Sequence, residues 1–303
     1  MPTNISTQQN QPAEIKKLRA QRQLNADAKK VVGLQMIMTI ALPVAGAVAG
    51  LWWPKALEGV LAFYGIVISV LDVSVLERWQ TRLRKRAATI QESFDCSVLN
   101  LPWDEMRVGP RPEEEDVHQA SSAHRGGKED ASLVNWYPTA VAEVPLSLGR
   151  IICQRANLRW DAQLRRRYRG WLAVALLTLG AIVSIIGFRQ GASLEQLTLS
   201  VLAPIAPMLL WGIREFQKHG EAAEISDRLR ERITTVWTTA LQKRWSEQEL
   251  DLFSRQLQGE IYNRRLTAPM IFSWVYRLLR SSGEEQMNVA AGELVKEAKS
   301  CGF

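Results

Sequence analysis

The sequence is poor in the two residue types that most often form disulfides or bind metals. Its 303 residues include three cysteines and three histidines. Cys96, Cys153 and Cys301 are an odd number with no CxxC pair, which excludes a disulfide scaffold and favours a reducing compartment. The histidines are scattered, and no HExxH, GxSxG or GxxxxGK[ST] pattern occurs. We therefore expect no metal site, no cofactor and no catalytic centre.

Charge is missing from four stretches of the chain. Val31–Trp53, Gly170–Phe188 and Gln196–Ile213 carry none, and Gly59–Leu76 carries only Asp72. Each is close to the roughly 20 apolar residues that cross a membrane as a helix, whereas helices of soluble proteins average about 11–12 residues. The sequence therefore predicts four transmembrane helices in two hairpins. A large buried helical core is the alternative.

The positions of the charges favour the membrane interpretation. The two short links contain Lys55 with Glu58 and Arg189 with Glu195, so neither link has a net charge. The other 36 Lys and Arg residues precede the first stretch, lie between the second and third, or follow the fourth. Because cytoplasmic segments of membrane proteins carry the excess of Lys and Arg, both termini and the middle segment are predicted to be cytoplasmic.

These spans divide the chain into five parts and predict an all-α membrane protein with a mainly helical cytoplasmic body. The parts are an N-terminal cytoplasmic helix (1–30), a first hairpin (31–76), a cytoplasmic middle domain (77–169), a second hairpin (170–213) and a C-terminal helical domain (214–303). In the last part, apolar residues recur at helical spacing from Ile225 to Leu241 and from Leu250 to Ile261. Gly109–Asp130 is rich in Pro, Gly, Ser and acidic residues and is expected to be an exposed loop or a disordered insert.

The densest cluster of polar and aromatic residues precedes the third apolar stretch. On a helix, Asn157, Asp161 and Arg165 share one face, while Trp160 lies on another. Guanidinium groups suit phosphate, Asn and Asp can hydrogen-bond a base or ribose edge, and an aromatic ring can stack on a base. These four residues and Arg155 are therefore candidates for binding a nucleotide or for supporting that site.

Two further clusters in the middle segment mix aromatic and polar residues beside a proline. One contains Gln91 and Glu92, and the other contains Trp136 and Tyr137. They are candidate ligand contacts, with core aromatics whose polar ends find partners as the alternative. Glu92 and Asp95 could also act as acid and base in a hydrolase, although carboxylates in a basic segment more often form ion pairs.

The same clusters resemble a known family. The strings QESFDCxVLxLPW (91–103), WYP (136–138) and CQRxNLxWDxxLRRRY (153–168) lie between the two predicted hairpins and are similar to those of the SMODS-associated four-transmembrane effector family. A weaker likeness extends to both ends of the chain. In the N-terminal part, Asn25 stands in place of the tyrosine expected after Gln23-Leu24.

The resemblance implies a bacterial inner-membrane effector of CBASS, the cyclic-oligonucleotide antiphage signalling system. A functionally linked nucleotidyltransferase would make a cyclic oligonucleotide messenger on infection. The effector would bind it, assemble as a homo-oligomer and permeabilise the lipid bilayer, and the cell would die by abortive infection. A constitutive membrane scaffold or small channel is the alternative, and a membrane-anchored hydrolase is a third.

The net charge of +7 would by itself also fit a protein that binds long nucleic acids. Most of the positive residues, however, lie in the segments predicted to face the cytoplasm and meet lipid headgroups. The arginines that remain stand among aromatic residues. This pattern suits one small nucleotide better than a long polymer.

Overall fold

The computed structural model describes residues 5–42, 63–68, 70–126, 130–189 and 203–303. Every regular element in these ranges is a helix, which confirms the all-α class. None of the helices found there is both long and apolar enough to cross a bilayer. Parts of three predicted spans, in 43–62 and 196–202, lie outside the described residues.

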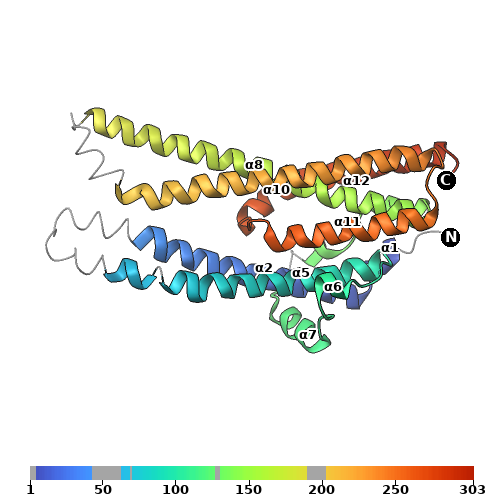
Figure 1. The fold of residues 1–303 in the computed structure, drawn as a ribbon, viewed down its shortest axis with the longest axis horizontal. Helices are drawn as coiled ribbons and strands as arrows, with labels where there is room; N and C mark the ends of the chain where they lie inside the picture. The colour runs from blue at the N-terminus through green and yellow to red at the C-terminus, as the bar shows by residue number, and fades with distance from the viewer. Residues whose placement is uncertain (1–4, 43–62, 69, 127–129, 190–202) are drawn as a thin grey trace. The chain divides into compact units, whose positions relative to one another are not determined.

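In the described residues, six long helices or helix pairs follow one another along the chain, with short helices between them (Figure 1). The long elements are α2 (Pro12–Met36) with the π-helical η1 (Ile37–Ala41), η2 (Asp72–Leu76) with α5 (Glu77–Val98), α8 (Leu146–Arg189), α10 (Ala203–Leu241), α11 (Glu247–Thr267) and α12 (Ser273–Ser300). The short elements are α1 (Ile5–Gln8), α6 (Glu105–Val108), α7 (Glu114–Ala123), η3 (Asp130–Leu133) and η4 (Thr139–Glu143).

The chain forms two compact units, which we call unit 1 and unit 2. Unit 1 comprises Met1–Asp27, Leu83–Arg165 and Glu221–Phe303, and unit 2 comprises Ala28–Arg82 and Arg166–Gly220. All four charge-poor stretches fall in the residue ranges of unit 2. Helices α8 and α10 each contribute residues to both units.

The core of unit 1 is built by the apolar stripes of the C-terminal part. Leu229, Ile233 and Trp237 of α10 are buried, as are Leu257 and Ile261 of α11. They form one cluster with apolar residues of α5, α8 and α12, among them Phe94, Leu148, Ile151 and Val295. The helical spacing predicted from the sequence is confirmed from Leu229 onward, whereas Ile225, where the predicted stripe begins, is 40% exposed.

Helix α11 begins at a residue pair that fixes its start. The side chain of Ser246 accepts a hydrogen bond from the Glu249 amide at 3.3 Å, and the Glu249 carboxylate accepts one from the Ser246 amide at 2.8 Å. This reciprocal capping box satisfies two amide groups that the first helical turn leaves without partners.

The prediction of an exposed loop at Gly109–Asp130 is wrong for its central part. Residues Glu114–Ala123 form α7, whose acidic first turn interacts favourably with the positive end of the helix dipole. Val117 and Ala120, one turn apart, are buried against apolar residues of α2 and α5. Asp116 of α7 also forms an ion pair with Arg86 of α5 at 2.7 Å. Two buried apolar side chains are too few to give a visible stripe in the sequence.

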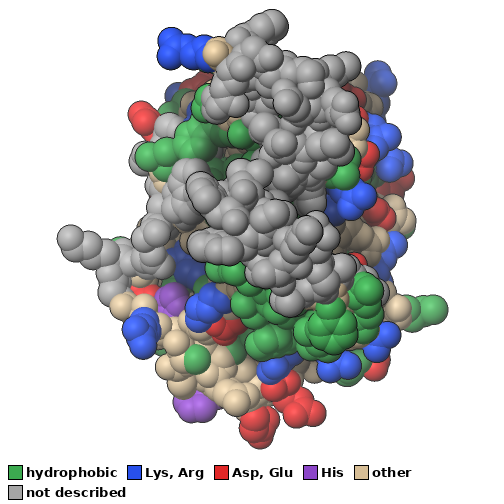
Figure 2. All heavy atoms as spheres, turned by 90° about the vertical axis from the view of Figure 1, so that its left-hand side faces the viewer, with side chains coloured by type: hydrophobic (Ala, Val, Ile, Leu, Met, Phe, Trp, Pro, Cys, Tyr) green, Lys and Arg blue, Asp and Glu red, His purple; other side chains and the backbone are tan. Residues whose placement is uncertain are grey.

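Unit 2 exposes many large hydrophobic side chains. Fractional exposures reach 70% for Phe63 and 75% for Leu177. Others lie on helical residues throughout this unit: Leu34, Ile37, Ile66, Val70, Val75, Val174, Ile182, Ile185, Leu210 and Ile213. Hydrophobic side chains also gather on the face displayed in Figure 2. Exposed apolar surface of this extent marks a region that contacts lipid or another protein.

Candidate functional site

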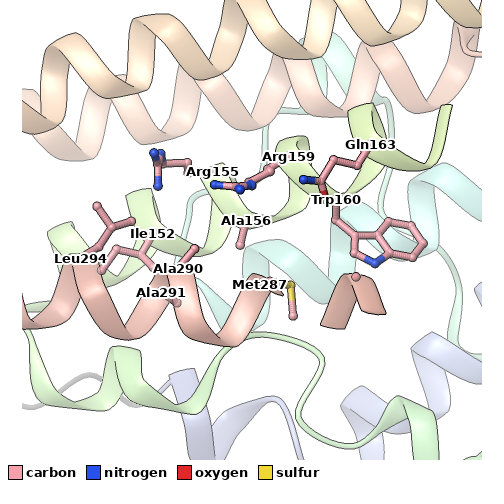
Figure 3. Close-up of a pocket in the computed structure, with 11 residues that line it drawn as sticks. Ile152, Arg155, Ala156, Arg159, Trp160, Gln163, Met287, Ala290, Ala291 and Leu294 are labelled. Atoms are coloured by element: carbon pink, nitrogen blue, oxygen red, sulfur yellow. The ribbon is translucent and has the colours of Figure 1, made fainter. Parts of the chain in front are cut away.

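A groove in unit 1 separates α8 from α12. Its narrow part is a cavity of about 20 Å³, and it widens into an open depression of about 410 Å³. The volume of the open depression is in the range of small-molecule sites, roughly 300–1,000 Å³, whereas the narrow part has room for about one water molecule. Helix α8 contributes Ile152, Arg155, Ala156, Arg159, Trp160 and Gln163 (Figure 3). Helix α12 contributes Gly283, Met287, Ala290, Ala291 and Leu294.

The spacing of these residues explains why they share the groove. On both helices they recur at intervals of three and four, so each set forms one stripe on its helix. Small residues of α12 leave room between the two stripes. At Gly283 a Cβ atom would lie 2.8 Å from Nε1 of Trp160, so only glycine accommodates the indole ring in this position.

The α8 wall of the groove is positively charged. Burial, followed by the charges of Arg159 and Arg230, lowers the pKa of the Arg155 guanidinium, and Glu297 partly opposes this effect. Part of this shift comes from the two neighbouring positive charges, and an anion placed among them would relieve their repulsion. Nε of Arg159 is buried and has no hydrogen-bond partner among the described residues. The groove is therefore suited to a phosphate group.

Asp161 and Arg165, two other predicted residues, lie in a buried ion cluster beside the groove. Oδ2 of Asp161 accepts a hydrogen bond from Nε of Arg165 at 2.6 Å and another from Arg264 of α11. Arg165 also donates to the carbonyl of Pro269 at 2.9 Å, in the connection between α11 and α12. Burial lowers the pKa of Arg264 to about 10, although Asp161 counteracts it. The cluster fixes α8 to the end of α11.

Glu92 lies in a second buried network, between α5 and α11. Its carboxylate is fully buried and accepts hydrogen bonds from Arg255 at 2.9 Å and from Gln258 at 2.8 Å. Burial, and then the neighbouring charge of Asp95, raise the pKa of Glu92, whereas Arg265 and the hydrogen bonds lower it. Glu92 thus joins two helices in the interior of unit 1.

Asp95 brings the loop before α8 into this network. Its carboxylate accepts hydrogen bonds from the Tyr137 hydroxyl at 2.7 Å and from Arg265 at 2.6 Å. The neighbouring Trp136 packs edge-on against Phe94, with ring centroids 6.4 Å apart. The expectation that the carboxylates of this segment are ion-paired is confirmed, and the aromatic residues pack as core side chains with partners.

The comparisons with known proteins agree with the motifs in these networks. Residues 3–294 match the SMODS-associating 4TM effector domain. The chain belongs to this family. A relative named "Probable CBASS effector molecule", from Bacillus cereus strain VD146, is 22% identical over 285 residues, which cover 92% of this chain and 94% of that protein. No solved structure matches the chain. The resemblance predicted from the sequence is confirmed.

The remaining predicted residues of this S-4TM effector lie outside the groove. Asn157 is half-buried on α8 and does not line the groove. Gln91 accepts a hydrogen bond from Gln21 of α2 at 3.3 Å. Of the nine predicted site residues, the structure thus places Arg155 and Trp160 in the groove. The others lie beside it or in the buried networks.

Sequence reasoning missed several groove residues. Arg159 and Gln163 follow Arg155 at intervals of four, so the helical face that carries Arg155 predicts them directly. The α12 wall has no such signal, because its small and apolar residues resemble any buried helix face. Among the described residues, no group of three or more His, Cys, Asp or Glu side chains is placed to hold a metal ion.

Proposed function

We propose that this S-4TM effector acts in antiphage defence by binding a cyclic oligonucleotide in the groove between α8 and α12. The observation that carries the proposal is the combination of Arg155 and Arg159 with Trp160 in one groove. Arginine binds phosphate through a planar fork of donors, and tryptophan offers a face on which bases stack. The family and the name of the Bacillus cereus relative support the defence role.

The proposed response takes place in unit 2. Its exposed Phe63, Ile66 and Leu177 and the four charge-poor stretches support a location in the bacterial inner membrane, as does the "4TM" in the family's description. A messenger that binds the assembled form better than the resting form drives assembly by that difference in affinity. Assembly of several copies would then permeabilise the bilayer.

The effector is proposed to work by binding and not by catalysis. A catalytic acid and base would have to reach a substrate, but Glu92 and Asp95 are fully buried. Both are held by arginine and glutamine side chains of α11. We therefore predict that the messenger is recovered intact after incubation with the protein.

The proposal is tested with purified full-length protein in liposomes loaded with a self-quenching dye. A panel of cyclic di- and trinucleotides is added to the wild type, to Arg155→Ala/Arg159→Ala, and to the control Arg244→Ala, an exposed arginine outside the groove. We expect at least one messenger to release dye from the wild type and the control. Each hydrogen-bonded charge contributes about 1.5–3 kcal/mol, so the double variant should need at least roughly 100-fold more messenger.

Two results would contradict this proposal. Dye release without any messenger, unchanged in the double variant, would identify a constitutive channel. Messenger-dependent release that the double variant retains at the same concentration would place the binding site elsewhere.

A further inference from the structure

The wide end of the groove has walls of opposite charge. Arg155 and Arg159 line it from α8, whereas Glu293 and Glu297 line it from α12. The two glutamates are four residues apart and therefore share one face of α12. A ligand that consisted of phosphate alone would be attracted to one wall and repelled by the other. The groove is instead complementary to a ligand with phosphates on one side and hydrogen-bond donors on the other.

The carboxylates differ in how firmly they are held. Oε2 of Glu297 accepts a hydrogen bond from Nε1 of Trp237 at 2.9 Å, which leaves Oε1 as its second acceptor. Glu293 forms an ion pair with Lys296 at 2.8 Å. The side chains of Lys296 and Glu293 are 75% and 67% exposed. Exposed pairs of this kind stabilise weakly and are easily exchanged. Glu293 can therefore turn both oxygens toward a ligand.

The bases differ in the donors that they offer to such a carboxylate. The Watson–Crick edge of guanine presents two adjacent donors, N1–H and the N2 amino group, which match the two oxygens of one carboxylate. Adenine and cytosine present a single amino group there, and uracil a single N3–H. Ribose hydroxyls are also donors, but they are common to all these nucleotides. The acidic wall therefore distinguishes guanine from the other bases.

We propose that the groove selects a cyclic oligonucleotide that contains guanine, with the guanine edge on Glu293 and the adjoining phosphate on Arg155 and Arg159. This selectivity rests on the proposed messenger-binding function. Glu297, oriented by Trp237, takes the remaining donor from the ribose or the amino group.

The test measures equilibrium binding of cyclic dinucleotides to the full-length protein in detergent. The ligands contain two guanines, guanine and adenine, two adenines, or two uracils, and a further analogue carries hypoxanthine in place of guanine. One bidentate pair to a base discriminates by about 1–3 kcal/mol, so guanine ligands should bind roughly 5- to 150-fold more tightly than those without guanine. Hypoxanthine lacks only the N2 amino group and should lose most of this preference.

Variants assign the preference to the acidic wall. Glu293→Gln should bring the affinity for the guanine ligand down to that for the adenine ligand, whereas Glu231→Gln, an exposed glutamate on α10, should leave both unchanged. If all ligands bind equally and all are lost in Arg155→Ala/Arg159→Ala, the selectivity is refuted and the groove function stands. If none of the ligands binds, the groove function itself fails. A guanine preference that survives Glu293→Gln also refutes the assignment.

Discussion

Replacing Asp161 by asparagine separates the residues that support the groove from those that would contact a ligand. The substitution keeps the size of the side chain and removes the negative charge between two arginines. Arg165 and Arg264 are each only 6% exposed, so water cannot compensate for the lost carboxylate. Arg264 already carries an unfavourable charge, since burial lowers its pKa to about 10.

The expected loss of stability follows from this burial. Removing one partner from a buried ion pair costs about 3–5 kcal/mol, because the remaining charge stays buried without compensation. In the variant, Arg165 still donates to the Pro269 carbonyl, at 2.9 Å. We therefore expect a loss of unfolding free energy near the lower end of this range, about 3 kcal/mol. Arg264 keeps a positive neighbour in Arg165 and loses its carboxylate.

The assay is denaturant unfolding of the full-length protein in detergent, followed by tryptophan fluorescence, with Arg155→Ala as the comparison. Arg155 stands among like charges, so its removal should change the unfolding free energy by less than about 1 kcal/mol. A loss below about 1 kcal/mol in Asp161→Asn would refute the buried-cluster reasoning. An equal loss in both variants would refute the distinction between support and contact.

Three further predictions concern single positions. Gly283→Ala should displace the Trp160 indole and weaken messenger binding about tenfold. Thermal stability should be kept, because alanine is the better helix former by about 1 kcal/mol. Unchanged binding in a titration would contradict this prediction. Burial raises the pKa of Glu92, so its contribution to stability falls as pH rises above 4.5. The advantage of wild type over Glu92→Gln in unfolding free energy should therefore be larger at acidic than at neutral pH, and a growing advantage toward pH 7 would overturn this. Ser246→Ala removes the cap of α11 and should cost about 1 kcal/mol without changing the affinity for messenger, as unfolding and binding curves would reveal.

Local patterns in the sequence predicted the parts of the fold that depend on periodicity. The stripe of Leu250, Leu257 and Ile261 specified the buried face of α11, and the helical phase of Arg155 already contains Arg159. The sequence did not predict helix α7, because its composition is that of a loop and its helical structure depends on packing against α2 and α5. Short segments whose structure depends on tertiary contacts carry little signal of their own.

The partners of the motif residues could not be predicted, because they are far away in the chain. Glu92 and Asp161 meet arginines of α11 that lie more than a hundred residues later. Nothing in the string QESFDC says which distant side chain neutralises its carboxylates. The motifs therefore indicated the family correctly, but they did not show which of their residues line the groove and which belong to the buried networks.

Hydrogen–deuterium exchange of the full-length protein, with and without a messenger that triggers dye release, tests the central claim most directly. The account predicts that the messenger slows exchange in 152–163 of α8 and 283–297 of α12, and that Arg155→Ala/Arg159→Ala abolishes this protection. Protection confined instead to the buried networks around 91–95 and 136–137, with none in α8 and α12, would contradict it.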